Sequence, residues 1–227
     1  MSEEKKVNHL AVIIDGNRRY AKEKGMLSYK GHESGAEKVE DFLDWCKELG
    51  IKEVTIYTLS TENLKRDSIE LKFLFEIIER YFKKFLNSRK IHDNRVKIRF
   101  IGDLSLIPES LRNLALELEK KTEEYNNFLL NFCFSYGGRL ELVHAFNKLK
   151  NKDGKITEED ITNALWLKDE PDLIIRTGNA IRTSNFLLWQ SVYSEWIFLE
   201  KMWPAFTKED LISALGEFKN RKRNFGK

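Results

Sequence analysis

Proline, cysteine and long apolar runs are scarce in this chain of 227 residues. Three prolines and 12 glycines leave no linker and no low-complexity tract, which favours one continuous domain over residues 1–227. The two cysteines, Cys46 and Cys133, lie in segments patterned like a core helix and a core strand, so buried thiols are a better interpretation than a disulfide or a metal pair. No window approaches the ~20 apolar residues of a membrane span, and no apolar signal region follows the charged N-terminus. We therefore expect a soluble, cytoplasmic protein.

An excess of one sign of charge is also missing. The 39 lysines and arginines face 36 aspartates and glutamates, which leaves a net charge of +3. This balance excludes a chain that coats a polyanion, and we expect no nucleic-acid partner. Hydrophobic residues make up 41% of the sequence, which is enough for a sizeable core and argues against disorder.

Apolar runs of strand length alternate with helical patterns along the whole chain. Because such alternation is typical of parallel sheets, we predict an α/β fold: a single domain whose six-stranded, mostly parallel sheet has helices on both faces. Strands are expected at residues 9–14, 54–59, 96–101, 128–134, 173–175 and 196–199, and helices around 39–49 and at 69–86, 108–118, 139–149, 157–166 and 207–218.

Polar residues follow four of these strands directly. In parallel sheets, ligands bind beyond the carboxyl ends of the strands. Arginine matches the geometry of phosphate oxygens, and a strand-to-helix turn after Gly16 would direct free N–H groups at an anion. Each residue alone is more often structural: a lone aspartate caps a helix and a lone arginine is solvated. The loops are Asp15 to Arg19; Ser60 to Asn63 with Arg66; Ser135 to Arg139; and Arg176 to Gly178 with Arg182 and Ser184.

One early aspartate among these cations suggests a metal-bridged phosphate ligand. Asp15, with Glu62 and Glu195 as the other nearby candidates, could hold Mg²⁺, which needs only one or two carboxylates when substrate phosphates complete its shell. His32 could donate to a phosphate or be an ordinary polar loop residue. The sequence contains no dinucleotide-binding glycine motif, no P-loop and no serine nucleophile elbow.

The long helix expected at 69–86 carries more apolar residues than one face requires. Phe73, Ile77 and Leu86 widen the stripe formed by its other apolar residues. Such a helix could be wedged between the sheet and a neighbour, or used in a dimer, or it could line an apolar tunnel. A tunnel beside a phosphate site would suit a lipid-like phosphate ester.

These residues lie in five motifs that together resemble the cis-prenyltransferases, the undecaprenyl diphosphate synthase family. The resemblance extends in order over nearly the whole chain. The motifs are Ile14-Asp15-Gly16-Asn17-Arg18-Arg19-Tyr20-Ala21-Lys22, Gly31-His32-Glu33-Ser34-Gly35, Ser60-Thr61-Glu62-Asn63-Leu64-Lys65-Arg66, Tyr136-Gly137-Gly138-Arg139, and the segment from Asp172 to Gln190 with Arg176, Arg182, Thr183 and Ser184.

The resemblance implies a single-domain, homodimeric, Mg²⁺-dependent transferase that joins isopentenyl diphosphate to an allylic prenyl diphosphate with a new Z double bond. Membrane contact would be at most peripheral, through a lipid product. By position, Asp15 matches the catalytic, metal-handling aspartate, Glu195 a second metal-linked carboxylate and Asn63 a residue assigned to proton removal. The resemblance also implies that Gly16, Asn17, Arg18, Arg19 and His32 hold the allylic diphosphate, that Arg176, Arg182 and Ser184 hold isopentenyl diphosphate, and that Tyr20, Ser28, Ser60, Thr61, Glu62, Leu64, Arg66 and Thr183 contribute to substrate binding.

Several positions depart from the family pattern and bear on the product. Ser28 stands where an arginine is typical, and Arg18 or Lys30 could replace its charge. Arg18 itself replaces a glycine, and Asn224 replaces a second arginine near the C-terminus. Ordinary chain elongation is the favoured interpretation. A short or irregular, non-head-to-tail product, a non-catalytic partner subunit and a binding module for phosphorylated lipids are the alternatives.

Overall fold

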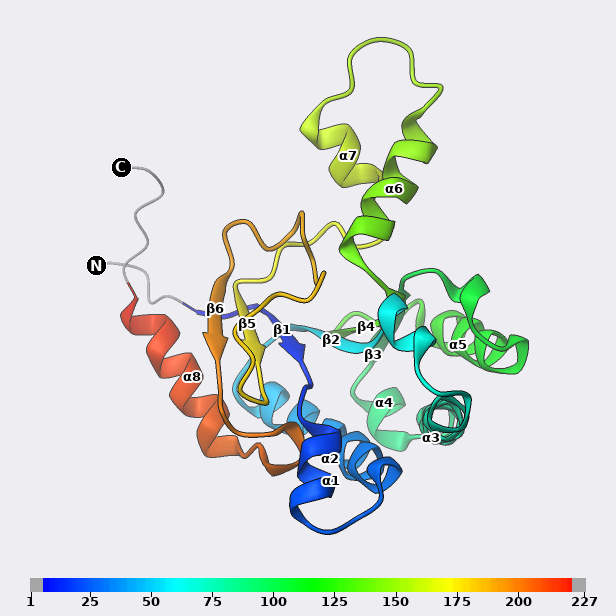
Figure 1. Ribbon diagram of the computed structural model, residues 1–227. Coiled ribbons are helices and arrows are strands. Elements are labelled where there is room, and N and C mark those ends of the chain that lie inside the picture. The colour runs from blue at the N-terminus through cyan, green and yellow to red at the C-terminus, as the bar shows by residue number, and fades with distance from the viewer. Residues whose placement is uncertain (1–5, 222–227) are drawn as a thin grey trace.

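The six expected strands form one sheet in which every neighbouring pair is parallel (Figure 1). The computed structural model describes residues 6–221, and the strand order is β3-β4-β2-β1-β5-β6. This arrangement confirms the α/β fold predicted from the alternation. The strands are β1 (His9–Ile13), β2 (Glu53–Ser60), β3 (Val96–Ile101), β4 (Phe128–Tyr136), β5 (Leu173–Arg176) and β6 (Glu195–Phe198).

The helices include the six that the apolar periodicity predicts. Two further helices, α1 and α4, have only seven and five residues, too few turns to show a period of 3.6 in the sequence. No helix within residues 6–221 is both long enough and apolar enough to cross a membrane. The helices are α1 (Asn17–Glu23), α2 (Ser28–Glu48), α3 (Ser68–Leu86), α4 (Arg89–Asp93), α5 (Glu109–Thr122), α6 (Gly138–Leu149), α7 (Glu158–Ala164) and α8 (Lys208–Asn220), and the short 3₁₀ helices are η1 (Thr61–Lys65), η2 (Leu104–Leu106) and η3 (Trp203–Ala205).

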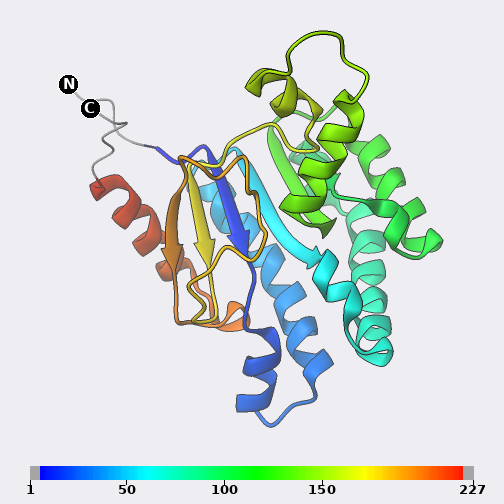
Figure 2. The same cartoon turned by 45° about the horizontal axis from the view of Figure 1, so that its top comes forward.

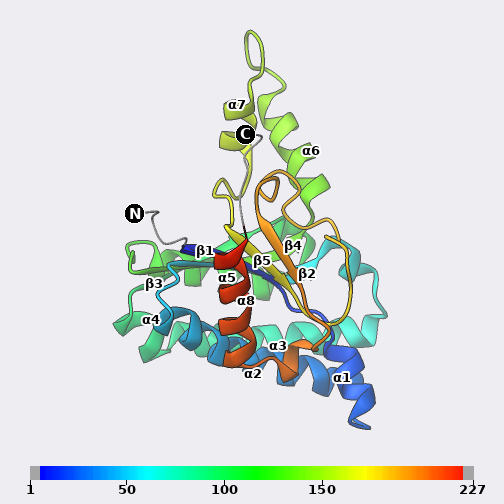
Figure 3. The same cartoon turned by 90° about the vertical axis from the view of Figure 1, so that its left-hand side faces the viewer.

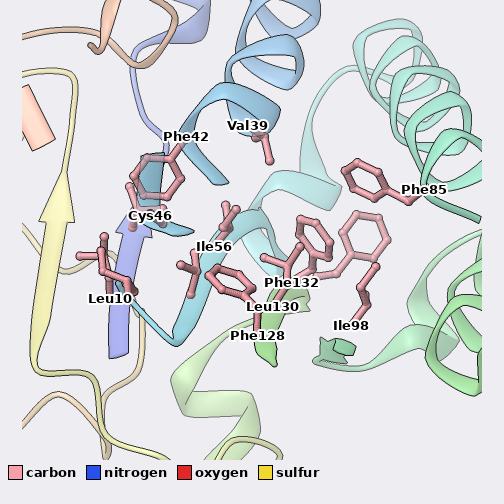
Figure 4. Packing of buried hydrophobic residues seen from close by; sticks show 14 of the residues in the cluster. Leu10, Val39, Phe42, Cys46, Ile56, Phe85, Ile98, Phe128, Leu130 and Phe132 are labelled. Atoms are coloured by element: carbon pink, nitrogen blue, oxygen red, sulfur yellow. The ribbon is translucent and has the colours of Figure 1, made fainter. Parts of the chain in front are cut away.

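The two faces of the sheet are covered differently. One face packs against α2, α3, α5 and α8, and side chains such as Leu10, Ile56 and Phe132 meet Phe42 and Phe85 there (Figure 4). The other face is covered mainly by the irregular segments 166–167 and 186–187. Helices α6 and α7 pack on each other and extend away from the sheet (Figures 1 and 3). Helices therefore lie on both sides, but only one side is a continuous helical layer.

The chain order places a ligand-binding crevice at the carboxyl ends of β1 and β5. From β1 the chain forms β2, then β3 at the edge, then β4 between β3 and β2, and finally β5 and β6 on the other side of β1. Such a reversal of strand order opens a crevice beyond the strand ends. Ile13 is paired with Arg176, so the residues that follow β1 and those that follow β5 emerge side by side. A register shift between Tyr57 and Ser60 also alters the end of β2 beside this crevice.

A largely buried carboxyl group at the amino end of β2 gives the stability a predictable pH dependence. Burial raises the pKa of Glu53 to about 7 from an ordinary value of 4.5, while Asn131 Nδ2 donates to its Oε1 at 2.7 Å. The folded protein therefore binds the proton more tightly, and the free energy of unfolding falls as the pH rises from about 4.5 to about 7. We expect Glu53→Gln to match the wild type at pH 5 and to be about 2–3 kcal/mol more stable at pH 8, measured by urea unfolding.

Neighbouring His9 shifts stability in the opposite direction. Burial lowers the pKa of His9 to about 4 from 6.5, so its contribution to stability rises with pH between those values. Because His9 Nε2 lies 3.6 Å from Glu53 Oε1, the two groups titrate together, and the difference between the two proteins reports the pair. An equal difference at both pH values would contradict the assignment.

Candidate active site

Asp15 lies at the end of β1, where several groups fix its carboxylate. Oδ1 accepts from the Gly16 N–H at 2.7 Å, and Oδ2 accepts from Arg176 Nη2 at 2.9 Å. Gly16 has φ +104°, and a Cβ there would lie 2.8 Å from the side chain of Met202. Glycine is therefore required at this turn. The next residue, Asn17, begins α1, whose N-terminus has no side-chain cap. The first N–H groups of this helix can donate hydrogen bonds to an anion.

Arg176 joins Asp15 to the loop that follows β5. Its side chain is only 4% exposed. Besides contacting Asp15, its Nη1 donates to Ser184 Oγ at 2.7 Å and to the carbonyl of Arg182 at 2.5 Å. Its Nε is buried without a hydrogen-bond partner, which is a cost unless a ligand accepts from it. The guanidinium thus fixes the loop, and Arg176 is part of the cavity lining.

The loop after β5 is held in an unusual backbone conformation. Ser184, Asn185 and Leu187 have φ values of +51°, +64° and +45°, a region that costs side-chain-bearing residues energy and often marks functional sites. Asn185 accepts from the N–H of Arg139 through Oδ1 at 2.9 Å and donates to Glu62 through Nδ2 at 3.0 Å. The Tyr57 hydroxyl also lies 3.4 Å from the Ser184 carbonyl. Residues on or directly after β2 and β4 thus hold the strained loop that follows β5.

A second group, made of two arginines and a histidine, faces Glu70 in the first turn of α3. The distances to Oε1 of Glu70 are 3.3 Å from Arg66 Nη1, 3.5 Å from His32 Nε2 and 3.7 Å from Arg18 Nε. Burial, followed by the charge of Arg66, lowers the pKa of His32, so near neutral pH this imidazole offers a hydrogen bond without a charge. Glu70 holds these groups together in the absence of a ligand. A diphosphate would replace it as their anionic partner.

Close packing of α1 on α2 places Asn17 between these two groups. A Cβ at Gly31 would lie 2.0 Å from the Asn17 carbonyl oxygen, and one at Gly35 would lie 2.1 Å from Asn17 Oδ1. Both glycines are therefore needed for the helices to approach. Asn17 Nδ2 donates to the Ile14 carbonyl, whereas Oδ1 is buried without a partner. This oxygen faces Gly35 of α2 and has no hydrogen-bond partner there, which is a cost of the close packing.

The polar residues form the head of one cavity of about 1070 Å³. Its other walls are apolar and come from α2, α3 and β4, with Val39, Leu74, Ile78, Phe85 and Phe132 among them. Of the three surplus apolar residues of α3, Ile77 lines this space, whereas Phe73 is exposed and Leu86 packs in the core. A charged head with an apolar extension fits a phosphate ester that carries a long hydrocarbon chain.

Asn63 caps a short helix and is not free to act as a base. Ser60 Oγ accepts from the Asn63 N–H, and the Ser60 N–H donates to Asn63 Oδ1, both at 3.2 Å. The carbonyl oxygen of the amide is therefore occupied, and an amide is in any case a weak base. This reciprocal cap holds Asn63 at the cavity wall in a fixed orientation.

The cavity brings together most, but not all, of the residues that the resemblance selects. Tyr20, Thr61, Leu64, Arg182 and Thr183 are not among its lining residues; Leu64 packs partly against the core, and Arg182 contributes its carbonyl. The lining includes Asp15, Gly16, Asn17, Arg18, Arg19, Ser28, His32, Ser60, Glu62, Asn63, Arg66, Arg176 and Ser184.

Glu195 lies at the opposite end of the sheet from Asp15. It is the first residue of β6 and is paired with Leu173, whereas the site lies beyond Arg176. Its Oε2 accepts from Arg221 Nη1 at 2.8 Å. The expected pairing with Asp15 at a metal is therefore not formed within one chain, because a parallel strand starts at the edge remote from the site. A metal-linked role for Glu195 would require a second copy.

The structure distinguishes between the two proposed substitutes for the arginine missing at Ser28. Arg18 lines the cavity beside Glu70. Lys30 is paired with Glu33 at 2.8 Å and does not line the cavity. Arg18 is therefore the better placed substitute. The expected change at Asn224, with Arg223 before it, lies outside the described residues.

Asp15 is the carboxylate best placed to hold a metal in this cavity. No cluster of three or more His, Cys, Asp or Glu residues suited to a metal occurs in the described part of the chain. One carboxylate, supplemented by substrate phosphate oxygens and water, nevertheless fits Mg²⁺, which prefers hard oxygen ligands and retains its waters. The donors at hand are consistent with a metal that binds together with substrate.

Three residues of the site are absent from the sequence-based selection. Glu70 could not be recognised from the sequence, because a glutamate is common in the first turn of a helix. Tyr57 lies on the face of β2 opposite Ile56, which the alternation of the strand could have shown. Asn185 belongs to the quoted motif after β5, and an asparagine there could have indicated a left-handed turn.

The fold and cavity define a class: α/β proteins that bind phosphorylated, long-chain apolar ligands at the carboxyl edge of a parallel sheet. Residues 13–226 match the prenyltransferase family model of undecaprenyl diphosphate synthases. The chain therefore belongs to the undecaprenyl diphosphate synthase family and is a transferase of prenyl groups.

Two archaeal relatives and one plant structure illustrate this similarity. The chain is 44% identical to a tritrans,polycis-undecaprenyl-diphosphate synthase (geranylgeranyl-diphosphate specific) of Pyrobaculum aerophilum, with 96% of this chain and 95% of that protein covered. It is 43% identical to the protein of the same name in Methanopyrus kandleri, with 96% and 84% covered. It also resembles a lavandulyl diphosphate synthase from Lavandula x intermedia, solved with dimethylallyl diphosphate: TM-score 0.90, 31% identity, 97% and 98% covered.

Proposed function

We propose that this protein condenses isopentenyl diphosphate with an allylic prenyl diphosphate to form a Z-polyprenyl diphosphate, with geranylgeranyl diphosphate as the primer. The observation that carries this proposal is the cavity itself, in which two groups of cations flank Asp15 and an apolar wall extends beyond them. The names of the archaeal relatives support the choice of primer.

The two groups of cations suit two diphosphates. Arg18, Arg66 and His32 would hold the allylic diphosphate, and Arg176 with Ser184 would hold that of isopentenyl diphosphate. Charge grows on the allylic diphosphate as its C–O bond breaks, so the two arginines, with a hydrogen bond from neutral His32, would stabilise the transition state more than the bound substrate. Mg²⁺ bound at Asp15 and the substrate oxygens would neutralise part of this charge.

Bond formation releases one proton and one diphosphate. The terminal alkene carbon of isopentenyl diphosphate bonds to the allylic carbon that loses its diphosphate. The methylene next to the internal alkene carbon then loses a proton, and the new double bond forms between these two carbons. Because the Asn63 carbonyl accepts from Ser60, we assign proton removal to a diphosphate oxygen. Asn63 and Ser60 then position the alkene.

A short or irregular product is the second candidate. The lavandulyl diphosphate synthase, bound to dimethylallyl diphosphate in its crystal, supports it. In that case dimethylallyl diphosphate would be used in preference to longer primers, and the apolar wall of the cavity would stay partly empty.

One assay separates the candidates. The protein is incubated with Mg²⁺, labelled isopentenyl diphosphate and allylic primers of five to 20 carbons, and the products are resolved by length and by double-bond geometry. We expect long Z-products with highest kcat/KM for geranylgeranyl diphosphate. A single short product from dimethylallyl diphosphate would favour the second candidate. No product from any primer would indicate a non-catalytic partner subunit or a lipid-phosphate binding module.

We also propose that the protein is a cytoplasmic homodimer of single-domain chains. Exposed apolar side chains on the second side of the sheet, Val143 and Phe146 of α6 and Val192 in the segment before β6, support a contact between copies. Light scattering in solution would give the mass of the assembly.

A further inference from the structure

Apolar side chains are exposed at the start of the two helices that enclose the cavity. Leu27 and Ile69 are 67% and 66% exposed, and Met26 and Phe73 are also exposed. The Tyr29 and Phe73 rings stack with centroids 5.0 Å apart, which joins the start of α2 to the start of α3. We call these five residues the entrance patch. Its side chains belong to one surface because the two helix starts are in contact.

The entrance patch is continuous with the interior of the cavity. Met26 is both exposed and part of the cavity lining. One turn further along, Leu74 and Ile78 of α3 line the apolar wall. Figure 2 shows α1 and its connection to α2 beyond the carboxyl ends of the strands, so this end of the molecule projects from the sheet. An apolar path therefore leads from the cavity to the surface.

The segments that carry the patch are strongly basic, although the whole chain is nearly neutral. Residues 18–30 and 65–73 contain eight basic and three acidic residues. Three of the eight are arginines that line the cavity, Arg18, Arg19 and Arg66, and the other five are lysines. Lysine side chains can lie along an apolar surface with their ammonium groups among phosphates. The exposed lysines here are Lys22, Lys24, Lys30, Lys65 and Lys72.

We propose that the entrance patch docks on an anionic lipid bilayer, with Leu27, Ile69 and Phe73 among the acyl chains and the lysines at the head groups. Apolar residues surrounded by lysines are the composition that binds such interfaces. A second copy of the same surface would meet charge of its own sign and be repelled. Docking would bring the mouth of the cavity to the membrane, so that a long prenyl product could pass into the bilayer. The proposal concerns binding and does not depend on the reaction.

Co-sedimentation with vesicles tests the proposal. Full-length protein is mixed with vesicles of phosphatidylcholine alone or of phosphatidylcholine with about 30% phosphatidylglycerol. We expect binding to the anionic vesicles at least about tenfold tighter, and weakened by salt. The double variant Leu27→Ser/Ile69→Ser should lower that affinity about tenfold or more, as should Lys24→Glu/Lys72→Glu. Ile212→Ser, an exposed apolar residue on α8, is the matched control and should bind like the wild type.

The variants are exposed residues outside the cavity lining, so turnover of a short primer in detergent-free buffer should remain unchanged in all three. Equal binding to neutral and anionic vesicles, no binding to either, or loss of binding in the Ile212→Ser control would each overturn the proposal. A change of mass in the Leu27→Ser/Ile69→Ser protein, with vesicle binding unchanged, would assign the patch to a protein contact and likewise overturn it.

Discussion

Replacing Asp15 by asparagine should lower kcat/KM for condensation by about 10³-fold or more. Asparagine has the same shape, and its oxygen can still accept from the Gly16 N–H. The negative charge that faces Arg176 at 2.9 Å and that would bind Mg²⁺ is lost. Loss of a single preorganised group at a developing charge typically costs 10²–10³-fold, and here two functions depend on one carboxylate.

The dependence on Mg²⁺ distinguishes a metal role from a purely structural one. If Asp15 holds the metal, the variant needs more Mg²⁺ for half-maximal rate, and excess Mg²⁺ restores part of the activity. Glu33→Gln is a suitable control, because Glu33 is paired with Lys30 and Arg80 outside the cavity lining, and it should leave kcat/KM within about twofold of the wild type. An Asp15→Asn protein with near wild-type kcat/KM would contradict both assigned roles.

The sequence predicts the position of a site residue well where that position follows from chain direction alone. The alternation of strands and helices placed the polar loops after β1, β2, β4 and β5 at one edge, and Asp15 and Arg176 meet there. Chain direction also explains Glu195: as the first residue of a parallel strand it had to lie at the other edge. The motif match predicted a metal-linked role for Glu195, but the sheet topology places this residue away from Asp15.

Other features depend on contacts that the sequence does not encode locally. The approach of Arg18, His32 and Arg66 to Glu70 arises because α2 packs beside α3, and the packing of α1 on α2 requires Gly31 and Gly35. Helices α6 and α7 have ordinary helical patterns, yet they bury their apolar residues against each other. Periodicity identifies a helix and its apolar face but not the surface that this face meets.

Replacing Arg176 by lysine should impair the use of isopentenyl diphosphate far more than the use of the allylic primer. Lysine keeps the positive charge and can pair with Asp15, but a single ammonium group cannot replace the planar fork that also holds Ser184 Oγ and the Arg182 carbonyl. The loop with its three left-handed residues then loses the contact that holds it. We expect KM for isopentenyl diphosphate to rise about 100-fold, kcat to fall about tenfold, and KM for the primer to change less than about threefold.

A double-mutant cycle shows whether Arg176 and Asp15 act as one unit. Because they share a hydrogen-bonded ion pair, Asp15→Asn combined with Arg176→Lys should cost less than the product of the two single effects. Arg99→Lys, on the edge strand β3 beside Asp169 and outside the cavity lining, provides the matched control and should leave both KM values unchanged. If Arg176→Lys raised KM equally for both substrates, the guanidinium would support the whole cavity and not one of its two diphosphate positions. If the two single effects simply multiplied, Asp15 and Arg176 would act independently, and the ion pair between them would not be part of catalysis.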